Sequence, residues 1–510
     1  MNKKKNIAFK DYAPQQIMLL PPSLEELIEP DHPVRTVKQV IEQINLDPLI
    51  ANYKGGGTSS YHPRMLLKVL VYAYLRNVYS SRKIEEAVKQ DIHFMWLSGM
   101  SKPDHNTINR FRSERLKKVL KKIFAQVVTL LAEEGLLSLQ TAYIDGTKIE
   151  ANANRYTFVW GNAIKTSKER IAKQLEELWS YTEKIATQEL KDTAPVTFEK
   201  IDAQKVKQTI EQIDQALKDK PVDKKVKQKI NYAKKNWEKN LEKYSEQEKI
   251  LDKRNSFSKT DTDATFMRMK EDHMRNGQLK PGYNLQLSTN NQYITNYTVH
   301  HHPTDTLTLK SHIAEHENLY HQSPQTVVAD AGYGSQENYQ WMEEKNIEAF
   351  VKYNTFHKEQ EKKISDNPFL TENLFYNPQQ DCYYCPMGQP MKKIYDTAGK
   401  SLNGFTRHYS AYRAVNCEGC PLRSQCFKEK GNRIIKVNHQ LNHYKTKARE
   451  KLNSPEGILH RKKRMCDTEP VFANIKHNKN FKRFNLRGKQ KTEIEIGLIA
   501  LAHNLTKKAA

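Results

Sequence analysis

Apolar residues recur at helical spacing along the first 135 residues. The stretch "YHPRMLLKVLVYAYLRNVYS" carries them every three or four positions, and Pro63 stands where a helix can begin. Further on, the pattern predicts a short helix, a turn at Ser98–Gly99, and a long helix that starts near Asp104 and ends at Gly135. Residues 1–135 are therefore expected to form an all-α N-terminal domain.

The short helix, the turn and the long helix resemble a helix-turn-helix. This motif places its second helix in the major groove of DNA. The first turns of the long helix are expected to expose polar side chains, and the candidate DNA-binding residues among them are Asn109, Arg110 and Arg112. An ordinary helical bundle has the same pattern, so that interpretation stays open beside the first.

The pattern changes between about residues 155 and 258. This segment is rich in Lys, Glu and Gln, and its sparse apolar residues keep helical spacing. It predicts two or three long helices inserted into a domain, with breaks at Pro195 and Pro221. A solvated charged hairpin with no binding task explains the composition equally well.

Residues from 281 onward alternate with a period of two. "GYNLQLSTNNQYITNYTVHHH" predicts two strands joined by a turn at Asn290–Asn291. A helix (306–322), a buried strand ending at Asp330, a second helix (335–346) and another strand (347–353) follow. Together these segments predict an α/β core over residues 136–355, completed by helices in residues 441–510.

Charge indicates the partner class. Lys and Arg number 83 against 59 Asp and Glu, which gives a net charge of +24. Such an excess favours polyanions, nucleic acid first, although basic chains also bind anionic membranes. No apolar run reaches the roughly 18 residues that a bilayer span needs, and the basic start lacks the apolar stretch of a signal peptide. We therefore expect a soluble cytoplasmic protein without a membrane partner.

Two aspartates end predicted buried strands. Asp145 follows "TAYI" and Asp330 follows "TVVA", in the order strand, helical insertion, strand, strand, helix, strand. This order resembles an RNase H-like domain, in which the first and fourth strands lie side by side, so that the two carboxylates meet at one edge of the sheet. Adjacent carboxylates repel and are stable as a pair when a cation lies between them. A third acid completes a site for two Mg²⁺ (or Mn²⁺) ions, about 3.5–4 Å apart, which suits phosphodiester chemistry.

The third acid is expected on a later helix. "DTEPVFANIKHNKNFKRF" offers Glu469. Proline is tolerated near a helix start, so Pro470 predicts that Glu469 lies in a first turn with Asp467 or Thr468 near the cap. Lys476 follows seven residues later and is expected on nearly the same face, toward one DNA strand. Basic residues surround this acid and are further candidates for DNA contacts: Arg461, Arg464, Lys482 and Arg483.

Other acids and histidines are expected to have structural roles. Glu493 and Glu495 compete for the third place, but they belong to a helix whose apolar residues indicate packing. The remaining ones are expected in turns or in solvent: Asp261, Asp263, Asp305 and His300–His302.

Five of the six cysteines lie close together in residues 356–440. "CYYC" and "CEGCPLRSQC" give two Cys-x2-Cys pairs and one extra thiol, which predicts a small structural zinc-binding insertion. The spacer of 31 residues allows a ribbon with an inserted hairpin. The alternative is a set of free thiols in a loop. The candidate zinc ligands are Cys382, Cys385, Cys417, Cys420 and Cys426.

Four blocks of the sequence resemble those of bacterial insertion-sequence transposases of the DDE class. They are "AYIDGTKIEANANRYTFVW", "GYNLQLSTNNQYITNYTVHHHPTD", "VVADAGYGS" and "TEPVFANIKHNKNFKRFNLRG". The resemblance covers nearly the whole chain and implies an RNase H-like catalytic domain after a helical N-terminal domain. It also implies that Asp145, Asp330 and Glu469 are the DDE triad.

The resemblance further implies cut-and-paste movement of DNA. Its partners would be the terminal inverted repeats and a target duplex, bound by a homodimer at the nucleoid. Related enzymes surround the third acid with Tyr-x2-Arg-x3-Glu-x6-Lys. This chain keeps Glu469 and Lys476 but has Lys462 and Met465 at the first two positions, so a shifted Arg461 or Arg464 is expected to contact phosphate. A nuclease without strand transfer and a silent DNA-binding derivative are the alternatives.

Overall fold

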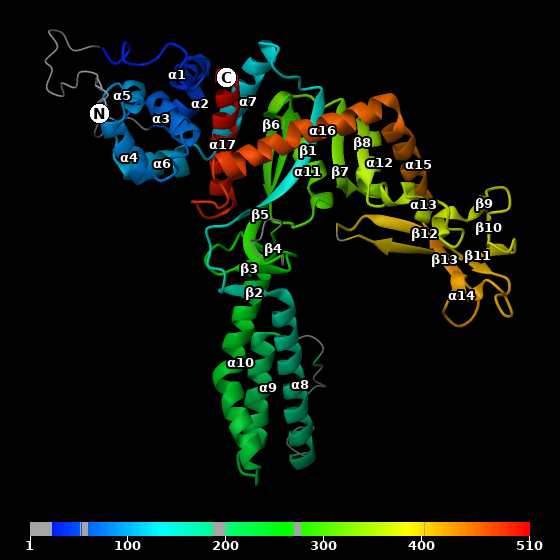
Figure 1. Cartoon of the computed structure of the whole chain (residues 1–510). Coiled ribbons are helices and arrows are strands. Elements are labelled where there is room, and N and C mark those ends of the chain that lie inside the picture. Colours follow the sequence, from blue (N-terminus) through cyan, green and yellow to red (C-terminus); the bar gives the residue numbers. More distant parts are fainter. Residues whose placement is uncertain are drawn as a thin grey trace, which may run out of the picture. The chain divides into compact units, whose positions relative to one another are not determined.

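The computed structural model describes residues 23–51, 53, 60–186, 198, 201–269, 277–401 and 403–510 (Figure 1). The chain divides into two compact units, residues 1–116 with 504–510, and residues 117–503. The N-terminal domain was expected to reach residue 135, whereas helix α7 (Leu120–Glu133) belongs to the second unit. Phe124 of α7 packs edge-on against Tyr297 of the central sheet. In the described ranges no helix is long and apolar enough to span a bilayer.

Short helices make up the first unit, and their ends follow from local chemistry. α3 begins at Pro63, whose missing N–H costs nothing in a first turn. α5 ends at Gly99, where a φ of +56° suits glycine. The Asp104 carboxylate accepts the N–H of Thr107 at 2.9 Å and caps α6 at the expected place. The helices are α1 (Pro33–Gln43), α2 (Asp47–Ile50), α3 (Pro63–Leu75), α4 (Ser81–Gln90), α5 (Ile92–Ser98) and α6 (His105–Arg110), followed by the π-helical turn η1 (Phe111–Arg115).

The long helix expected from Asp104 to Gly135 is interrupted by η1 and by turns at residues 116–119. Within η1, Arg112 is buried and donates to the Tyr74 hydroxyl at 3.2 Å and to the Tyr79 carbonyl at 2.6 Å. The expectation that Arg112 is exposed is therefore wrong, because the wider π turn directs its side chain into the helical core. Asn109 and Arg110 are exposed, as expected.

A six-stranded mixed sheet forms the centre of the second unit. Its order is β4-β5-β1-β7-β8, and β6 pairs with β5 as the expected hairpin. The hairpin turn has positive φ at Asn291 and Gln292, one residue later than expected. β7 pairs in parallel with both β1 and β8, whereas β5 is antiparallel to β1. The strands are β1 (Thr141–Glu150), β4 (Thr265–Arg268), β5 (Leu279–Asn290), β6 (Tyr293–His300), β7 (Thr326–Gly334) and β8 (Glu348–Tyr353).

Helices cover both faces of this sheet. On one face the Tyr143 hydroxyl of β1 lies 3.1 Å from the His460 imidazole of α16. The next residue, Ile144, points the other way, and its β5 partner Ser288 lies 2.7 Å from the imidazole of His312 on α11. The helices are α11 (Leu309–Tyr320), after the 3₁₀ turn η2 (Asp305–Leu307), α12 (Gln336–Glu344), α15 (His439–Asn453), α16 (Pro455–Ala473), the π-helical turn η5 (Asn474–Asn478) and α17 (Lys489–Ala509).

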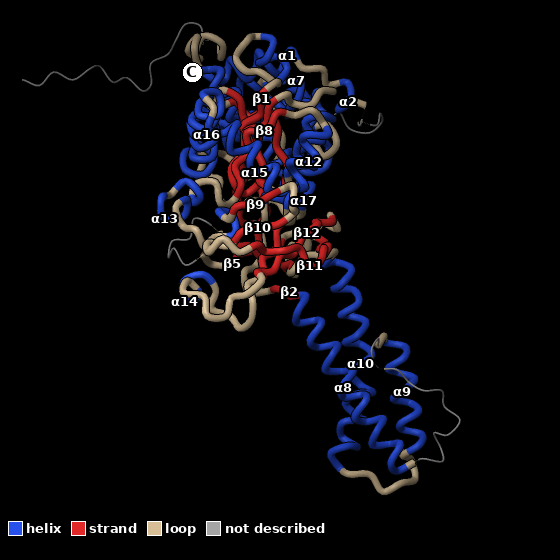
Figure 2. The backbone as a smooth tube through the Cα atoms, turned by 90° about the vertical axis from the view of Figure 1, so that its right-hand side faces the viewer, coloured by secondary structure: helices blue, strands red, loops and turns tan. Residues whose placement is uncertain are grey.

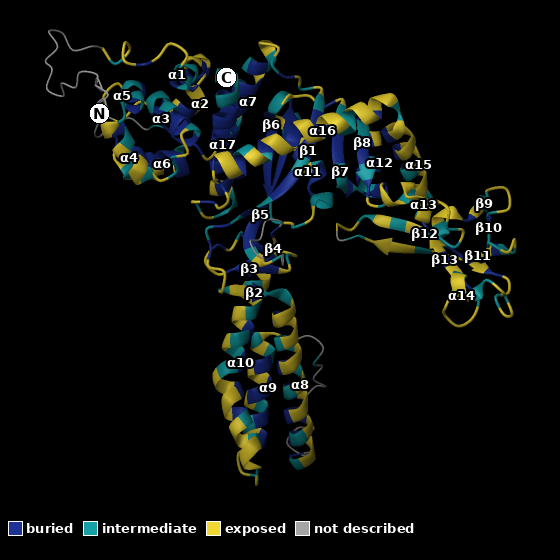
Figure 3. Cartoon of the chain, in the orientation of Figure 1, coloured by how far each residue is buried: buried dark blue, intermediate teal, exposed yellow. Residues whose placement is uncertain are grey.

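The expected helical insertion is a three-helix bundle with its own apolar core. Leu175, Ile213 and Trp237 are buried in this core, and the described charged residues of the bundle (Figures 2 and 3) are exposed or half-buried. Pro221 lies between α9 and α10, as expected, and Pro195 lies outside the described residues. β2 pairs with β3 where the bundle joins the core. The elements are β2 (Phe158–Trp160), α8 (Gly161–Ile185), α9 (Ala203–Ala216), α10 (Lys224–Leu251) and β3 (Ser256–Ser258).

The cysteine-rich segment forms a five-stranded antiparallel sheet in the order β13-β12-β11-β10-β9. The hairpin of β11 and β12 supplies the long spacer between the two groups of cysteines. Met391 and Tyr412 are buried in its small core. The elements are η3 (Lys358–Gln360), α13 (Lys362–Ser365), η4 (Thr371–Asn373), β9 (Phe375–Asn377), β10 (Cys382–Tyr384), β11 (Pro390–Lys400), β12 (Thr406–Ala414), α14 (Arg423–Cys426) and β13 (Ile434–Val437).

We predict that Arg112→Ala lowers the free energy of unfolding of the first unit by about 1–3 kcal/mol, because the buried Tyr74 hydroxyl and Tyr79 carbonyl lose their donor. Exposed Arg110 offers a matched control, and Arg110→Ala is expected to change stability by about 0.5 kcal/mol at most. Denaturant unfolding of the full chain, followed by circular dichroism, measures both. Equal stability of the two variants would contradict the buried position of Arg112.

Candidate functional site

The two strand aspartates lie where the parallel ladder between β1 and β7 ends. The last paired residues are Ile144 on β1 and Ala329 on β7, and each aspartate is the next residue along its strand. Neighbouring strands lie about 4.8 Å apart, so the ladder holds the backbones of Asp145 and Asp330 side by side. The two strands lie side by side, as expected, and the structure shows that they are parallel.

Neither strand ends at its aspartate, which differs from the sequence expectation. β1 continues to Glu150 because it stays paired with β5, and Asp145 itself pairs with Leu287. β7 continues to Gly334, which pairs with Tyr353 of β8. β1 and β7 therefore part at the aspartates and follow different neighbours, which leaves the two carboxylates at the opening between the strands.

A third acid, Asp305, approaches the same place from the α11 side. Its Oδ1 accepts Asn284 Nδ2 at 2.8 Å and Gln286 Nε2 at 2.9 Å. A Cβ on Gly146 would lie 2.8 Å from this oxygen and 2.4 Å from Gln286 Nε2. A Cβ on Gly332 would lie 3.0 Å from Asp330 Oδ1 and 3.4 Å from Asp305 Oδ2. The small residues beside both aspartates thus let a polar network approach the backbone closely.

Tyr333 connects this network to the aspartates. Its hydroxyl is fully buried and donates to Gln286 Oε1. Burial, together with the charges of Asp305, Asp145 and Asp330, holds the pKa of Tyr333 well above its ordinary value. Sequence reasoning missed this network because Asp305 was taken for a turn residue. The signal was the run of alternate polar residues on β5, since Asn284, Gln286 and Ser288 are all buried.

Glu469 lies near the C-terminal end of α16, not in a first turn, because the helix already begins at Pro455. Pro470 is inside the helix, where its missing N–H leaves the Cys466 carbonyl without its usual helical partner. Gln292 Nε2, from the β5–β6 turn, donates to that carbonyl at 3.0 Å and makes the interior proline tolerable. The Glu469 side chain is exposed.

Asp467 has a structural role two residues before Glu469. It is 2% exposed, and its carboxylate accepts the backbone N–H of Gln292 at 2.9 Å. Together with the Gln292–Cys466 hydrogen bond, this contact fixes α16 to the β5–β6 turn. Burial and the Asp467 charge also raise the pKa of Tyr143, on the underlying β1, to about 12.

Basic side chains of α16 face the aspartates. Arg464 is largely buried and donates to Asp145 Oδ2 at 3.2 Å. Arg461 stacks its guanidinium over Phe356, 5.4 Å from the ring centroid. Burial, with the charges of Arg464 and Arg461, lowers the pKa of Lys352 on β8, while the charge of Asp330 opposes this shift. Three basic side chains therefore share this end of the sheet with Asp145 and Asp330.

The other basic candidates lie in different surroundings. Lys476 is buried in η5, so it does not share the exposed face of Glu469, because the wider π turn breaks the helical spacing expected between them. Lys482 is exposed. Arg483 is exposed too, yet it donates to the carbonyls of Ala151 and Ala153, both at 3.2 Å, and so also fixes the chain that follows β1.

The competing acids have structural partners. Glu495 is fully buried and accepts the backbone N–H groups of Asn485 and Leu486 at 2.9 and 2.8 Å. Asp261 is buried and accepts the Tyr283 hydroxyl on both oxygens, and burial raises its pKa. These contacts agree with the packing and turn roles expected of them.

In the described part of the chain, no group of three or more Asp, Glu, His or Cys side chains lies close enough together to hold a metal ion. The described cysteines are all free thiols. Cys385, Cys417, Cys420 and Cys426 line one cavity, whereas Cys382 is directed toward Gln380 at 3.6 Å.

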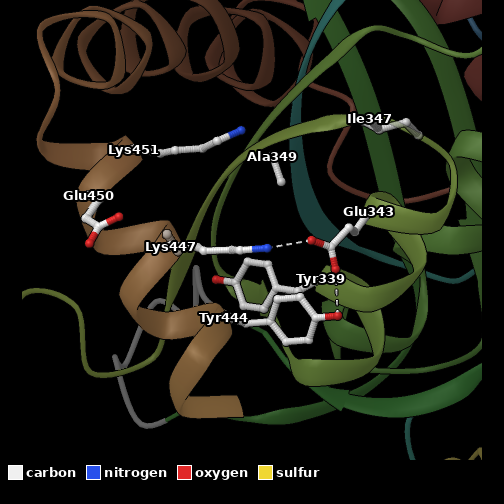
Figure 4. Close-up of a pocket in the computed structure, with 9 residues that line it drawn as sticks. Tyr339, Glu343, Ile347, Ala349, Tyr444, Lys447, Glu450 and Lys451 are labelled. Carbon is white, nitrogen blue, oxygen red and sulfur yellow. Dashed lines mark hydrogen bonds and ion pairs between the residues drawn. The ribbon is translucent and has the colours of Figure 1, made fainter. Parts of the chain in front are cut away.

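A cavity of about 300 Å³ lies beside the edge strand β8, and neither aspartate is among its lining residues (Figure 4). Tyr339 of α12 and Tyr444 of α15 stack in it, with ring centroids 5.9 Å apart. Glu343 accepts Lys447 Nζ at 2.7 Å and the Tyr444 hydroxyl at 2.9 Å. The Glu343 carboxylate, which points into the cavity, is therefore already bound by two donors.

Two family models match the chain. A model described as a transposase DDE domain matches residues 384–509, and one described as a transposase domain (DUF772) matches residues 22–114. The two matches support an insertion-sequence transposase of the DDE class. The DDE match includes Glu469 of this transposase, whereas the strands of Asp145 and Asp330 lie outside both matches. No match was found among curated proteins or among solved structures.

We predict that Asp467→Ala destabilises the second unit of the transposase by about 1–3 kcal/mol, because the Gln292 N–H loses its acceptor in a buried place. Glu469→Ala is the matched control and is expected to leave stability within about 0.5 kcal/mol, because the side chain is exposed. Thermal unfolding of the two variants measures the difference. A destabilised Glu469→Ala beside an unaffected Asp467→Ala would reverse the roles given to these two acids.

Proposed function

We propose that the transposase cleaves DNA at the inverted-repeat ends of an insertion sequence and joins those ends to a target, in cut-and-paste transposition. The observation that carries this proposal is the position of Asp145 and Asp330, side by side where the β1–β7 ladder ends, in a chain with a transposase DDE domain. The catalytic residues proposed are Asp145, Asp330 and Glu469.

The strand order supports an RNase H-like assignment for the core. Strands β1, β5 and β6 form an antiparallel series, and β7 and β8 then follow in parallel on the other side of β1. The first and fourth core strands are thereby neighbours, once the bundle and the short strands β2 to β4 at its base are set aside. This is the arrangement in which two strand carboxylates serve one site.

The residues at this opening fit a divalent cation. Two carboxylates on adjacent strands supply hard oxygen ligands of the kind that Mg²⁺ or Mn²⁺ prefers. Asp145 already binds a cation, the Arg464 guanidinium, which fits a place where negative charge needs a positive partner. When bound, two such ions would lower the pKa of an attacking water or 3′-hydroxyl and stabilise the leaving oxygen.

The protein's own groups would prepare this site. Asp305 and Gln286 pack against the backbone at Gly146 and Gly332. The N–H groups of these glycines donate to Asp145 Oδ1 and Asp330 Oδ1, which helps to fix where the two carboxylates point. The three acids are not close enough together to share an ion. Either α16 or the Glu469 side chain would therefore have to move toward the aspartates. Arg464 and Arg461, close to Asp330 and Lys352, would receive a DNA phosphate once Arg464 leaves Asp145.

DNA binding draws on both units. Asn109 and Arg110 are the proposed contacts of the helical unit, and Arg112 is left out because it is buried. In the second unit, Lys482 is the freely exposed candidate, while Arg483 and Lys476 would act through the chain that they stabilise. A homodimer on the paired element ends and a nucleoid location in the cytoplasm complete the proposal.

We predict that Asp330→Asn binds a duplex carrying the element's terminal repeat as tightly as wild type but cleaves it at least about 100-fold more slowly in Mg²⁺. Groups that only orient a metal ligand cost about 10–100-fold, so a ligand should cost more. Gel shift measures binding, and denaturing gels measure nicking and joining. Asp366→Asn, an exposed aspartate in the same unit, is the control and should behave as wild type.

The same assay separates the remaining roles. Glu469→Gln is expected to lose as much activity as Asp330→Asn, and Asp305→Asn about 10–100-fold. If Glu469→Gln were active and Asp305→Asn inactive, the third catalytic acid would be Asp305 and not Glu469. Cleavage without joining would indicate the nuclease alternative, and full activity of Asp330→Asn would remove the proposed site altogether.

A further inference from the structure

Four of the six cysteines line one small cavity in the cysteine-rich sheet. They come from three separate parts of the chain, with Cys385 directly after β10, Cys417 and Cys420 in the loop after β12, and Cys426 at the end of α14. We name this group, Cys385, Cys417, Cys420 and Cys426, the thiol pocket. We propose that the thiol pocket binds one structural Zn²⁺ with four thiolate ligands, and that Cys382 and Cys466 take no part.

The size and lining of the thiol pocket indicate the class of ligand. Its volume is about 30 Å³, which is close to the space of a single water molecule, so it suits an ion and not an organic cofactor. No carboxylate or imidazole is among the described residues that line it. Four soft sulfur donors select zinc over Mg²⁺ or Ca²⁺, which prefer oxygen ligands.

Two hydrogen-bond donors of Arg433, one of them cationic, lie beside two of the sulfurs. Arg433 is 7% exposed, and its Nη1 lies 3.1 Å from the Sγ of Cys426. Its backbone N–H lies 3.4 Å from the Sγ of Cys417. Such donors favour the thiolate over the thiol, and a guanidinium offsets part of the charge that four thiolates would bring. A purely apolar setting would instead keep the thiols protonated and unreactive.

A second arginine holds the loop that carries two of the ligands. Arg423 donates to the Cys417 carbonyl at 3.0 Å, to the Glu429 carbonyl at 2.7 Å and to the Gly431 carbonyl at 3.0 Å. Asn432 accepts the N–H of Cys417 at 2.9 Å through its side chain. The backbone around the thiol pocket is therefore fixed by groups other than the sulfurs. The four sulfurs are not yet close enough together to hold an ion, so zinc uptake requires them to converge.

The two remaining cysteines provide matched controls within the same chain. Cys382 precedes Cys385 by three residues, but it lies on β10, is buried, and is directed toward Gln380. Cys466 is exposed on α16. The spacing of Cys382 and Cys385 alone would count both as ligands, whereas the structure separates them.

Zinc content of the full chain, purified with reductant and without DNA, tests the proposal. Wild type is expected to hold about one Zn²⁺ per chain, released when a thiol-binding mercurial is added. Cys382→Ser and Cys466→Ser should keep this content, and Cys417→Ser and Cys426→Ser should lose most of it. Zinc retained by both pocket variants, or lost equally from Cys382→Ser, would overturn the proposal. The measurement does not involve strand cleavage, so its outcome is independent of the proposed transposition activity.

A second measurement uses the wild-type chain, so that the proposal can be tested even if the cysteine variants do not fold. Alkylation followed by mass spectrometry should find the four pocket thiols protected in zinc and modified after chelation, at least about tenfold faster. Cys466 should react at the same rate in both states, and Cys382 should not depend on the chelator. Pocket thiols whose alkylation rates do not depend on the chelator, or disulfides among them that persist in reductant, would overturn the assignment.

Discussion

The negatively charged carboxylates of Asp145 and Asp330 lie side by side and repel each other. Much of the surrounding structure compensates for this repulsion. The backbone gives Asp145 and Asp330 no freedom to move apart, because the parallel ladder ends only one residue before each of them. The charge must therefore be balanced from outside the strands. In this structure Arg464 of α16 supplies that balance at Asp145, and the proposed chemistry requires that a divalent ion can take its place.

The elements around the aspartates can be understood from this requirement. α16 must cross the sheet at a fixed height for Arg464 to reach β1, and the contacts of Gln292 with Asp467 and with the Cys466 carbonyl set that height. On the opposite face, the Asp305 network approaches glycine positions that admit no side chain. The Arg464–Asp145 ion pair and the Asp305 network thus meet at the same part of the sheet, from opposite faces. The three-helix bundle has a separate apolar core.

Much of the architecture follows from local patterns in the sequence, and what does not follow depends on long-range contacts. The ladder of β1 and β7 could be expected because two strand aspartates stood in a recognisable order of elements. The position of Glu469 could not be predicted. Proline is not expected inside a helix because it leaves one carbonyl without its hydrogen-bond donor, but here the distant Gln292 side chain donates to that carbonyl, which belongs to Cys466. Arg112 and Lys476 were misjudged for a related reason: a π turn shifts the helical face, and regular spacing cannot reveal it. Asp305 was assigned to a turn because its partners lie on another strand, which local patterns do not reveal.

The most direct test is a crystal of the transposase soaked in Mn²⁺, with the ion located by anomalous scattering. The account predicts a peak bound by the carboxylates of both Asp145 and Asp330, with Arg464 displaced from Asp145, and no such peak in a crystal of Asp330→Asn. A peak that touches only one of the two aspartates, or no ion between them at saturating Mn²⁺, would contradict the account.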